Sequence, residues 1–193
     1  CALPIMADAI SIMNRDGCEI VGICGGYQML GQHIDDPDGI EAGGRIVGLE
    51  LLDTYTTIQP FKATERICGD SLQWHTDGPL PISGYVIHMG QTDRGRDAPC
   101  FQIWPAKTGR DNDSISLDGA VSLDGRTWGS YIHGLFDLPG FRRGWLNRVR
   151  HRKSLMPLDL SVSNRVSARH HEELDRWATH LRAHLTLAPL LRS

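Results

Sequence analysis

The feature that most constrains the fold is the segment Gly22-Ile23-Cys24-Gly25-Gly26, which overlaps the end of an apolar run at residues 19–23. A short apolar run is typical of a buried strand, and residues 25–32, which follow, are compatible with a helix. The pattern therefore predicts a strand that turns abruptly into a helix at Cys24. Glycines two residues before and two residues after the cysteine leave room for such a crowded turn.

A turn of this kind would give Cys24 the properties of a nucleophile. It exposes the sulfur near the positive N-terminal end of a helix, which favours the thiolate and lowers the thiol pKa from its usual ~8.5. The backbone N–H of Gly25 would point to the place where a tetrahedral oxyanion forms. The alternative is a structural cysteine buried in a glycine-rich turn. The strand-to-helix context favours the nucleophile.

The rest of the chain has the pattern of an α/β domain. Helical spacing recurs at residues 2–14, 141–155 and 163–187, whereas residues 44–134 hold short apolar or alternating runs separated by turn residues. No low-complexity linker divides the 193 residues, so we expect a single domain over residues 1–193. We predict a mixed, largely parallel sheet flanked by helices, with the active site at the C-terminal ends of the strands.

Composition excludes several classes of function. The formal net charge of -3 gives no electrostatic reason to expect nucleic acid or an anionic membrane as a partner. No apolar run approaches the roughly 18 residues of a membrane span, and no signal peptide is visible. The five cysteines are odd in number and contain no C-x-x-C pair, which argues against a disulfide scaffold or a structural zinc site. We therefore expect a cytoplasmic protein without a metal site.

A thiol nucleophile needs a base, and histidine is the usual one. Among nine histidines, His88 and His133 each end an apolar, strand-like run and have a glycine within the next two residues. A histidine at such a strand end projects into the crevice where open α/β sheets bind ligands. Either residue alone is more often structural, but the predicted turn at Cys24 favours one of them as the base. His180 and His184 lack the carboxylate of a metal-binding H-E-x-x-H arrangement.

Several segments resemble a known family. The segment G-I-C-G-G-Y-Q-M-L-G at residues 22–31 resembles the nucleophile segment of class I, triad-type glutamine amidotransferases. Within that class, four further segments are similar to the cobyric acid synthase family, so that the resemblance covers roughly residues 17–190. They are V-G-L-E-L-L-D-T-Y-T-T (47–57), G-Y-V-I-H-M-G-Q-T (84–92), G-S-Y-I-H-G-L-F-D (129–137) and the tail L-D-R-W-A-T-H-L-R-A-H-L (174–185). The resemblance implies the flavodoxin-like, three-layer α/β sandwich of that class.

The resemblance also implies a reaction. Glutamine would be hydrolysed through a γ-glutamyl thioester on Cys24, with His133 as the base and then as the acid that protonates ammonia. Gly25 would supply an oxyanion donor, and Gln28 matches the position that helps to hold the glutamine substrate. No cofactor is implied for this domain. His88 is a crevice residue to which the resemblance gives no role.

In the family, the ammonia is used by a separate synthetase domain that needs ATP and Mg²⁺. That domain amidates side-chain carboxylates of the corrinoid adenosylcobyrinic a,c-diamide to give cobyric acid, late in cobalamin biosynthesis. No phosphate-binding G-x-x-x-x-G-K-S/T loop occurs in this sequence. We therefore expect the synthetase domain to be absent from this chain.

Two departures from the wider class affect the site. Many relatives have an acid two residues after the histidine, where this chain has Leu135; this predicts a Cys–His dyad, with Asp137 as a possible substitute. Family members also carry a strand ending in P-G-S/T-K before the nucleophile, and its glycine N–H is a second oxyanion donor. Nothing before Gly22 matches that strand, so we expect the N-terminal strands to be absent. Loss of one oxyanion donor typically lowers the rate by about 10²–10³.

Two other functions stay open on the sequence alone. One is a non-catalytic remnant or partner-docking module that keeps the fold but not the chemistry. The other is a thiol hydrolase or peptidase that uses the same Cys–His pair on a related α/β scaffold.

Overall fold

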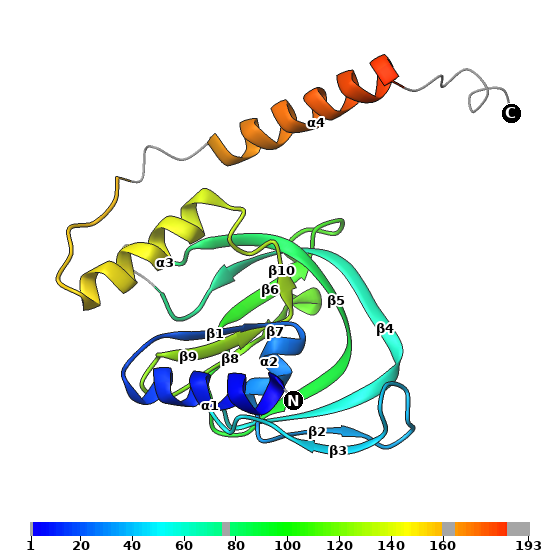
Figure 1. Cartoon of the computed structure of the whole chain (residues 1–193), viewed down its shortest axis with the longest axis vertical. Helices are drawn as coiled ribbons and strands as arrows, with labels where there is room; N and C mark the ends of the chain where they lie inside the picture. Colours follow the sequence, from blue (N-terminus) through cyan, green and yellow to red (C-terminus); the bar gives the residue numbers. More distant parts are fainter. Residues whose placement is uncertain (1, 75–77, 160–164, 185–193) are drawn as a thin grey trace, which may run out of the picture.

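The computed structural model describes residues 2–74, 78–159 and 165–184, and its described strands form two sheets (Figure 1). The smaller sheet contains, in spatial order, β1 (Ile20–Ile23), β9 (Thr127–Ser130) and β8 (Ala120–Val121). The larger sheet runs β10 (Ile132–His133), β5 (Pro81–Arg94), β4 (Thr54–Ser71), β2 (His33–Asp36) and β3 (Gly44–Val47), with β6 (Phe101–Pro105) paired to β4 and β7 (Ser116–Asp118) paired to β6. Figure 1 shows β4 and β5 as two long, curved strands that lie side by side.

The described α-helices agree with the predicted ones to within a few residues, whereas the short 3-10 helix was not predicted. The described helices are α1 (Ala2–Arg15), α2 (Gly25–Leu30), the 3-10 helix η1 (Asn112–Ser114), α3 (Pro139–Arg152) and α4 (Arg165–His184). α3 begins at Pro139, in the first turn, where the missing N–H of proline has no intrahelical partner to lose. The last residues of the helix predicted over 163–187, and its first two, lie outside the described ranges. In the part of the chain that is described, no helix is long and apolar enough to cross a membrane.

The strand directions differ in one respect from the expectation. The α/β class and the mixed sheet are confirmed, but the expectation of a largely parallel sheet is wrong for the described strands. Only β1–β9 and β2–β4 pair in parallel there, whereas the six other strand pairs are antiparallel. A parallel pair needs a long crossover connection, usually a helix. The described chain between residues 44 and 134 contains no α-helix, so successive strands there pair as antiparallel neighbours.

An aromatic cluster joins the two sheets to α3. Trp128 of β9 is fully buried, and its ring centroid lies 4.6 Å from that of Trp74 and 6.1 Å from that of Phe101 on β6. Phe141 of α3 is also fully buried and contacts the same three rings. Large aromatic side chains contribute more apolar area than any others, so this cluster carries much of the core.

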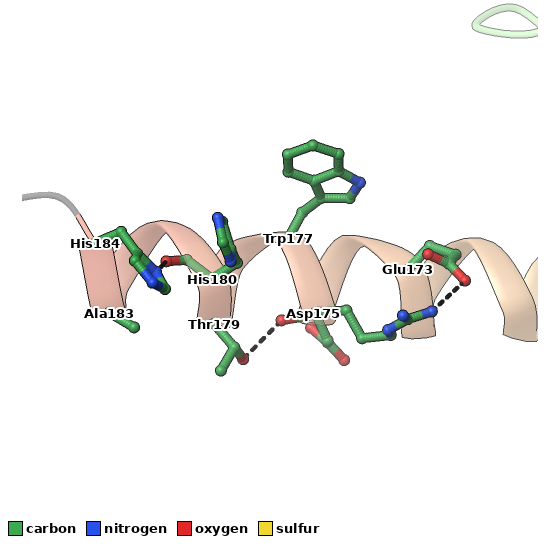
Figure 2. A pocket seen from close by; sticks show the side chains of 8 residues that line it. Glu173, Asp175, Trp177, Thr179, His180, Ala183 and His184 are labelled. Atoms are coloured by element: carbon green, nitrogen blue, oxygen red, sulfur yellow. Dashed lines mark hydrogen bonds and ion pairs between the residues drawn. The ribbon is translucent and has the colours of Figure 1, made fainter.

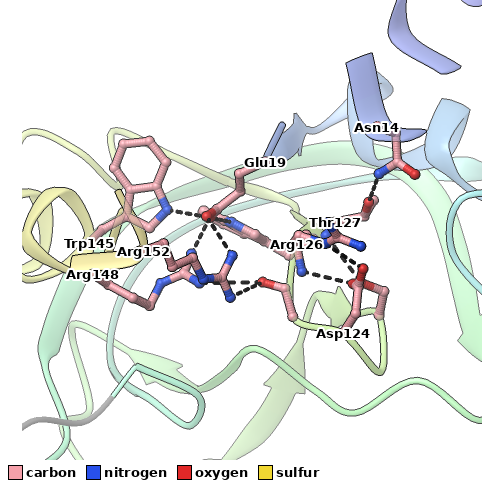
Figure 3. A network of polar contacts seen from close by, with 11 residues as sticks. Asn14, Glu19, Asp124, Arg126, Thr127, Trp145, Arg148 and Arg152 are labelled. Carbon is pink, nitrogen blue, oxygen red and sulfur yellow. Dashed lines mark hydrogen bonds and ion pairs between the residues drawn. The ribbon is translucent and has the colours of Figure 1, made fainter. Parts of the chain in front are cut away.

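A nearly buried carboxylate fixes α3 to the start of β1 (Figure 3). Glu19, whose side chain is 9% exposed, accepts hydrogen bonds from the indole N–H groups of Trp128 at 2.9 Å and Trp145 at 2.8 Å. The guanidinium groups of Arg148 and Arg152 complete its shell. A carboxylate withdrawn from water is tolerated only when it is paired in this way. These contacts hold the end of β1 that lies opposite Cys24.

Candidate active site

The turn at Cys24 has the predicted strand-to-helix geometry. β1 ends at Ile23, α2 begins at Gly25, and Cys24 between them has φ 54° and ψ -115°. A positive φ in a residue other than glycine costs on the order of 1–3 kcal/mol and persists only where the surroundings impose it. Here the Cys24 N–H donates to the Ser130 carbonyl at 2.9 Å, and its own carbonyl accepts from the Gln28 N–H at 3.2 Å. Both backbone groups of Cys24 are therefore fixed.

The two flanking glycines are not equivalent. A Cβ on Gly22 would lie 2.6 Å from the Gly26 carbonyl oxygen and 2.6 Å from a methyl of Leu30, so no side chain fits there. A Cβ on Gly26 would meet nothing within 4 Å. The expectation that both glycines make room for the turn is therefore right for Gly22 and wrong for Gly26. The crowding lies on the strand side, where α2 crosses β1 closely.

The thiol of Cys24 is half-buried and contacts β5. Its Sγ lies 3.6 Å from the Ile87 carbonyl oxygen and donates to it. Because a carbonyl oxygen can only accept, this contact requires the protonated thiol. A base must therefore take that proton before the sulfur can act as a nucleophile.

His133 lies on β10 beside the same stretch of β5. It pairs with Tyr85, and the two rings stack with centroids 5.0 Å apart and planes at 8°. Its Nε2 is buried and has no hydrogen-bond partner among the described residues. Leaving a buried polar atom unpaired costs about 1–3 kcal/mol, so this nitrogen is available to any proton donor that enters the site.

The structure thus places Cys24 and His133 beside the same part of β5, but it does not join them directly. The Cys24 thiol contacts Ile87, two residues from Tyr85, the cross-strand partner of His133. Within the described chain no hydrogen bond links the Cys24 sulfur to the imidazole. Catalytic hydrogen bonds are often long or misaligned without substrate and tighten when it binds.

No acidic third member supports the imidazole in the described structure. Leu135, which stands where many relatives have an acid, is buried and apolar. Asp137 is exposed; its N–H donates to the Gly134 carbonyl at 2.9 Å, and its carboxylate lies over Gly134. No hydrogen bond or ion pair from Asp137 to His133 is found in the described ranges. The described contact of the His133 ring is its stacking on Tyr85.

Gly25 and Gln28 both lie in α2, within one turn of Cys24. Gly25 is exposed, and its N–H makes no hydrogen bond with any described residue, as an oxyanion donor requires. Gln28 is half-buried, and its Nε2 donates to the hydroxyl of Tyr131 at 3.2 Å. Gln28 is therefore held in place, and it is not the freely exposed helix residue that its position alone would also allow.

His88 is fixed beside the site by two contacts. Its ring stacks on that of Tyr131, with centroids 3.8 Å apart and planes at 15°. Its Nδ1 lies 2.7 Å from the Gly90 carbonyl oxygen, so Nδ1 carries the ring proton. Both residues line a cavity of about 320 Å³ on the face of β5 and β4, together with Glu65, Thr92 and Asp118.

Asp118 precedes Gly119 in the sequence, an Asp-Gly pair that is a turn signal, and the structure buries it. Its carboxylate accepts from the Ser130 hydroxyl at 2.5 Å and from the Tyr131 N–H at 3.3 Å. Burial raises the pKa of this carboxyl group, and the Ser130 hydrogen bond opposes that shift. Asp118 thereby fixes the link between β9 and β10, which holds the Cys24 backbone on one side and carries His133 on the other.

A second hollow, along α4, is bounded by side chains of that helix alone (Figure 2). The rings of His180 and His184 stack there with centroids 4.2 Å apart, and Trp177 is 64% exposed beside them. Among the described residues no group of three or more histidine, cysteine or acidic side chains could hold a metal ion.

Comparison with known proteins identifies the same family as the motifs. Residues 3–141 match the model of the CobB/CobQ-like glutamine amidotransferase domain. A cobyric acid synthase of Ruegeria sp. (strain TM1040) is 40% identical over 179 residues, which cover 92% of this chain and 33% of that protein. Cobyric acid synthase of Nostoc punctiforme is 40% identical over 188 residues, covering 96% of this chain and 36% of the relative. The chain therefore spans about a third of the length of these relatives.

Proposed function

Because the chain belongs to the CobB/CobQ-like glutamine amidotransferase family, we propose that it hydrolyses glutamine to glutamate and ammonia through a thioester on Cys24. The observation that carries the proposal is the strained turn at Cys24, which presents a thiol beside the stretch of β5 that also holds His133. The family match favours glutamine over the peptide substrate of a related thiol hydrolase.

The first half of the reaction releases ammonia. Nε2 of His133 takes the thiol proton, and Sγ of Cys24 attacks the side-chain amide carbon of glutamine. The amide oxygen becomes an oxyanion that accepts a hydrogen bond from the Gly25 N–H. The C–N bond then breaks, and His133 returns the proton to the departing nitrogen, which leaves as ammonia.

The second half regenerates the thiol. His133 removes a proton from a water molecule, whose oxygen attacks the thioester carbon. The C–S bond breaks, Cys24 recovers its proton, and glutamate leaves. The sum is glutamine plus water to glutamate plus ammonia. Gln28, one helical turn after the nucleophile, contacts the bound glutamine in this proposal.

The destination of the ammonia is a further part of the proposal. Since the relatives are cobyric acid synthases, we expect an ATP- and Mg²⁺-dependent synthetase to use it to amidate side-chain carboxylates of adenosylcobyrinic a,c-diamide. This reaction belongs to cobalamin biosynthesis, and we expect it in the cytoplasm. The glutaminase half needs no cofactor in this scheme.

A second candidate function is a partner-docking module without catalysis. It is favoured by one observation: the Cys24 thiol is bonded to the Ile87 carbonyl and not to His133. A glutamine-analogue electrophile separates the two functions. Alkylation of Cys24 much faster than of the exposed Cys18 supports the enzyme, whereas equal alkylation supports the docking module.

Ammonia release from glutamine tests the enzymatic function directly. We expect Cys24→Ser to lower kcat/KM by on the order of 10³-fold or more, because the alcohol is a much weaker nucleophile than the thiolate. The matched control is Cys18→Ser, which changes an exposed cysteine on the loop before β1 and should keep the wild-type rate. Equal rates for wild type and Cys24→Ser would remove Cys24 from the mechanism.

A further inference from the structure

The proposed mechanism leaves one segment without a role. Residues 87–92 (Ile87-His88-Met89-Gly90-Gln91-Thr92) lie in the middle of β5, and the Ile87 carbonyl accepts a hydrogen bond from the Cys24 thiol. Three residues of this segment, His88, Gly90 and Thr92, lie around the side chain of Tyr131.

A chain of hydrogen bonds runs from the side-chain amide of Gln28 through three hydroxyl groups into the sheet. Nε2 of Gln28 donates to the Tyr131 oxygen at 3.2 Å, and that hydroxyl lies 2.6 Å from Oγ1 of Thr92. Oγ1 of Thr92 lies 2.8 Å from Oγ1 of Thr56, its cross-strand partner on β4. The Tyr131 oxygen accepts from Gln28, and in each of the two following hydrogen bonds either hydroxyl can donate. Chains of this kind strengthen each of their hydrogen bonds.

The remaining contacts fix the Tyr131 ring, and the glycine at residue 90 leaves room for the side-chain amide of Gln28. His88 stacks on one face of the ring and is itself held by the Gly90 carbonyl, while Tyr27 packs edge-on with centroids 5.2 Å apart. A Cβ on Gly90 would lie 2.3 Å from Nε2 of Gln28 and 2.8 Å from the Tyr131 hydroxyl. The absence of a side chain at residue 90 is therefore a condition for the Gln28–Tyr131 hydrogen bond.

These contacts determine which atom of the Gln28 amide can still form a hydrogen bond with a ligand. Nε2 is engaged by Tyr131, whereas Oε1 makes no hydrogen bond with any described residue. Oε1 can only accept, so its partner must be an N–H group. A glutamine substrate carries such groups in its ammonium and its side-chain amide.

We propose that Tyr131 is a positioning residue, held by His88, Gly90 and Thr92, that orients Gln28 so that Oε1 accepts a hydrogen bond from a nitrogen of the glutamine substrate. The inference rests on the proposed glutaminase function and names what the segment at residues 87–92 does for it. Tyr131 acts through Gln28 and does not touch the reacting atoms.

Steady-state kinetics of glutamine hydrolysis by the 193-residue chain test the assignment. We expect Tyr131→Phe to raise KM by roughly 5- to 10-fold and to change kcat by less than about 2-fold, because a binding contact is lost while Cys24 is untouched. Gly90→Ala should act in the same direction, by pushing the Gln28 amide aside. A wild-type KM in Tyr131→Phe would overturn the inference.

Paired threonine variants separate positioning from stability. Thr92→Val removes the hydroxyl that holds Tyr131 and should raise KM, whereas Thr92→Ser keeps it and should restore the wild-type KM. Thr54→Val is the matched control on β4: Thr54 is as buried as Thr56, but its Oγ1 has no partner among the described residues. A rise of KM in Thr54→Val equal to that in Thr92→Val would contradict the assignment.

A double-mutant cycle with Gln28→Ala gives the decisive result. If Tyr131 acts through Gln28, adding Tyr131→Phe to Gln28→Ala changes KM by less than about 2-fold. Independent, multiplying effects would show that Tyr131 has only a structural role. A wild type that hydrolyses no glutamine would overturn the proposed function and the substrate assignment together, whereas an active wild type with multiplying effects overturns this inference alone.

Discussion

The two glycines beside Cys24 give a sharp prediction, because the sequence treats them alike and the structure does not. Gly22→Ala would place a methyl group 2.6 Å from the Gly26 carbonyl oxygen and 2.7 Å from its carbonyl carbon. Backbone atoms cannot rotate away as a side chain can, so β1 and α2 must separate. Gly26→Ala would place its methyl group in open space. The pair therefore differs in one physical quantity, the overlap with fixed backbone.

The expected magnitudes follow from that difference. Overpacking of this kind costs about 1–3 kcal/mol, so we expect Gly22→Ala to lower the free energy of unfolding by about that amount. Gly26→Ala should keep or raise it by up to about 1 kcal/mol, because alanine favours helix more than glycine does. Displacement of Cys24 by about 1 Å would also lower kcat/KM of Gly22→Ala by roughly 10²-fold.

Urea unfolding, extrapolated linearly to water, measures the stabilities, and ammonia release measures the activity. Gly22→Ala with wild-type stability and activity would refute the packing argument at the turn. A Gly26→Ala protein less stable than Gly22→Ala would refute it as well, because the crowding would then lie on the helix side.

Three further predictions concern groups around the site. Glu19→Gln should lower the free energy of unfolding by up to about 3 kcal/mol, since it leaves the partly buried Arg148 without its counter-charge, and a normal melting temperature would contradict the network. His133→Ala should lower glutamine turnover by about 10²–10⁴-fold while melting within a few degrees of wild type; a loss of activity matched by unfolding would remove the base assignment. Burial raises the pKa of Asp118 above its unfolded value of 3.8, so its contribution to stability is full below that value and is lost as pH rises through the folded pKa. Urea unfolding from pH 4 upward should therefore show a flatter pH profile for Asp118→Asn than for wild type, and identical slopes would contradict the raised pKa.

Local features of the site were predictable because they depend on neighbours in the sequence. The glycine pattern around Cys24 predicted the strand, the turn and the helix, and the positive φ of Cys24 confirms the strain of that turn. Apolar runs predicted His88 and His133 at strand ends. This is confirmed for His133, the last residue of β10, and wrong for His88, which lies in the middle of β5 because that strand continues to Arg94. Periodicity could not distinguish them, because both runs have the same form. The structure does so, since Nδ1 of His88 is bonded to Gly90 whereas Nε2 of His133 is unpaired.

Features that depend on distant pairing were not predictable. Tyr131 meets Gln28 across 103 residues, and no spacing in either segment indicates the other. Asp118 looked like the first residue of a turn, because Asp-Gly is a turn signal whether or not the carboxylate is buried. The direction of the strands depends on how β4, β5 and β6 connect, and apolar alternation is the same for parallel and antiparallel neighbours.

The central claim is that Cys24 carries the glutamyl group during turnover. Mass spectrometry of peptides from the enzyme, quenched with acid during glutamine hydrolysis, tests it most directly. The account predicts an adduct with the mass of a glutamyl group on the peptide that contains Cys24, and neither adduct nor ammonia release above background from Cys24→Ala. Undiminished turnover by Cys24→Ala, or an adduct on another cysteine that persists in that variant, would contradict it.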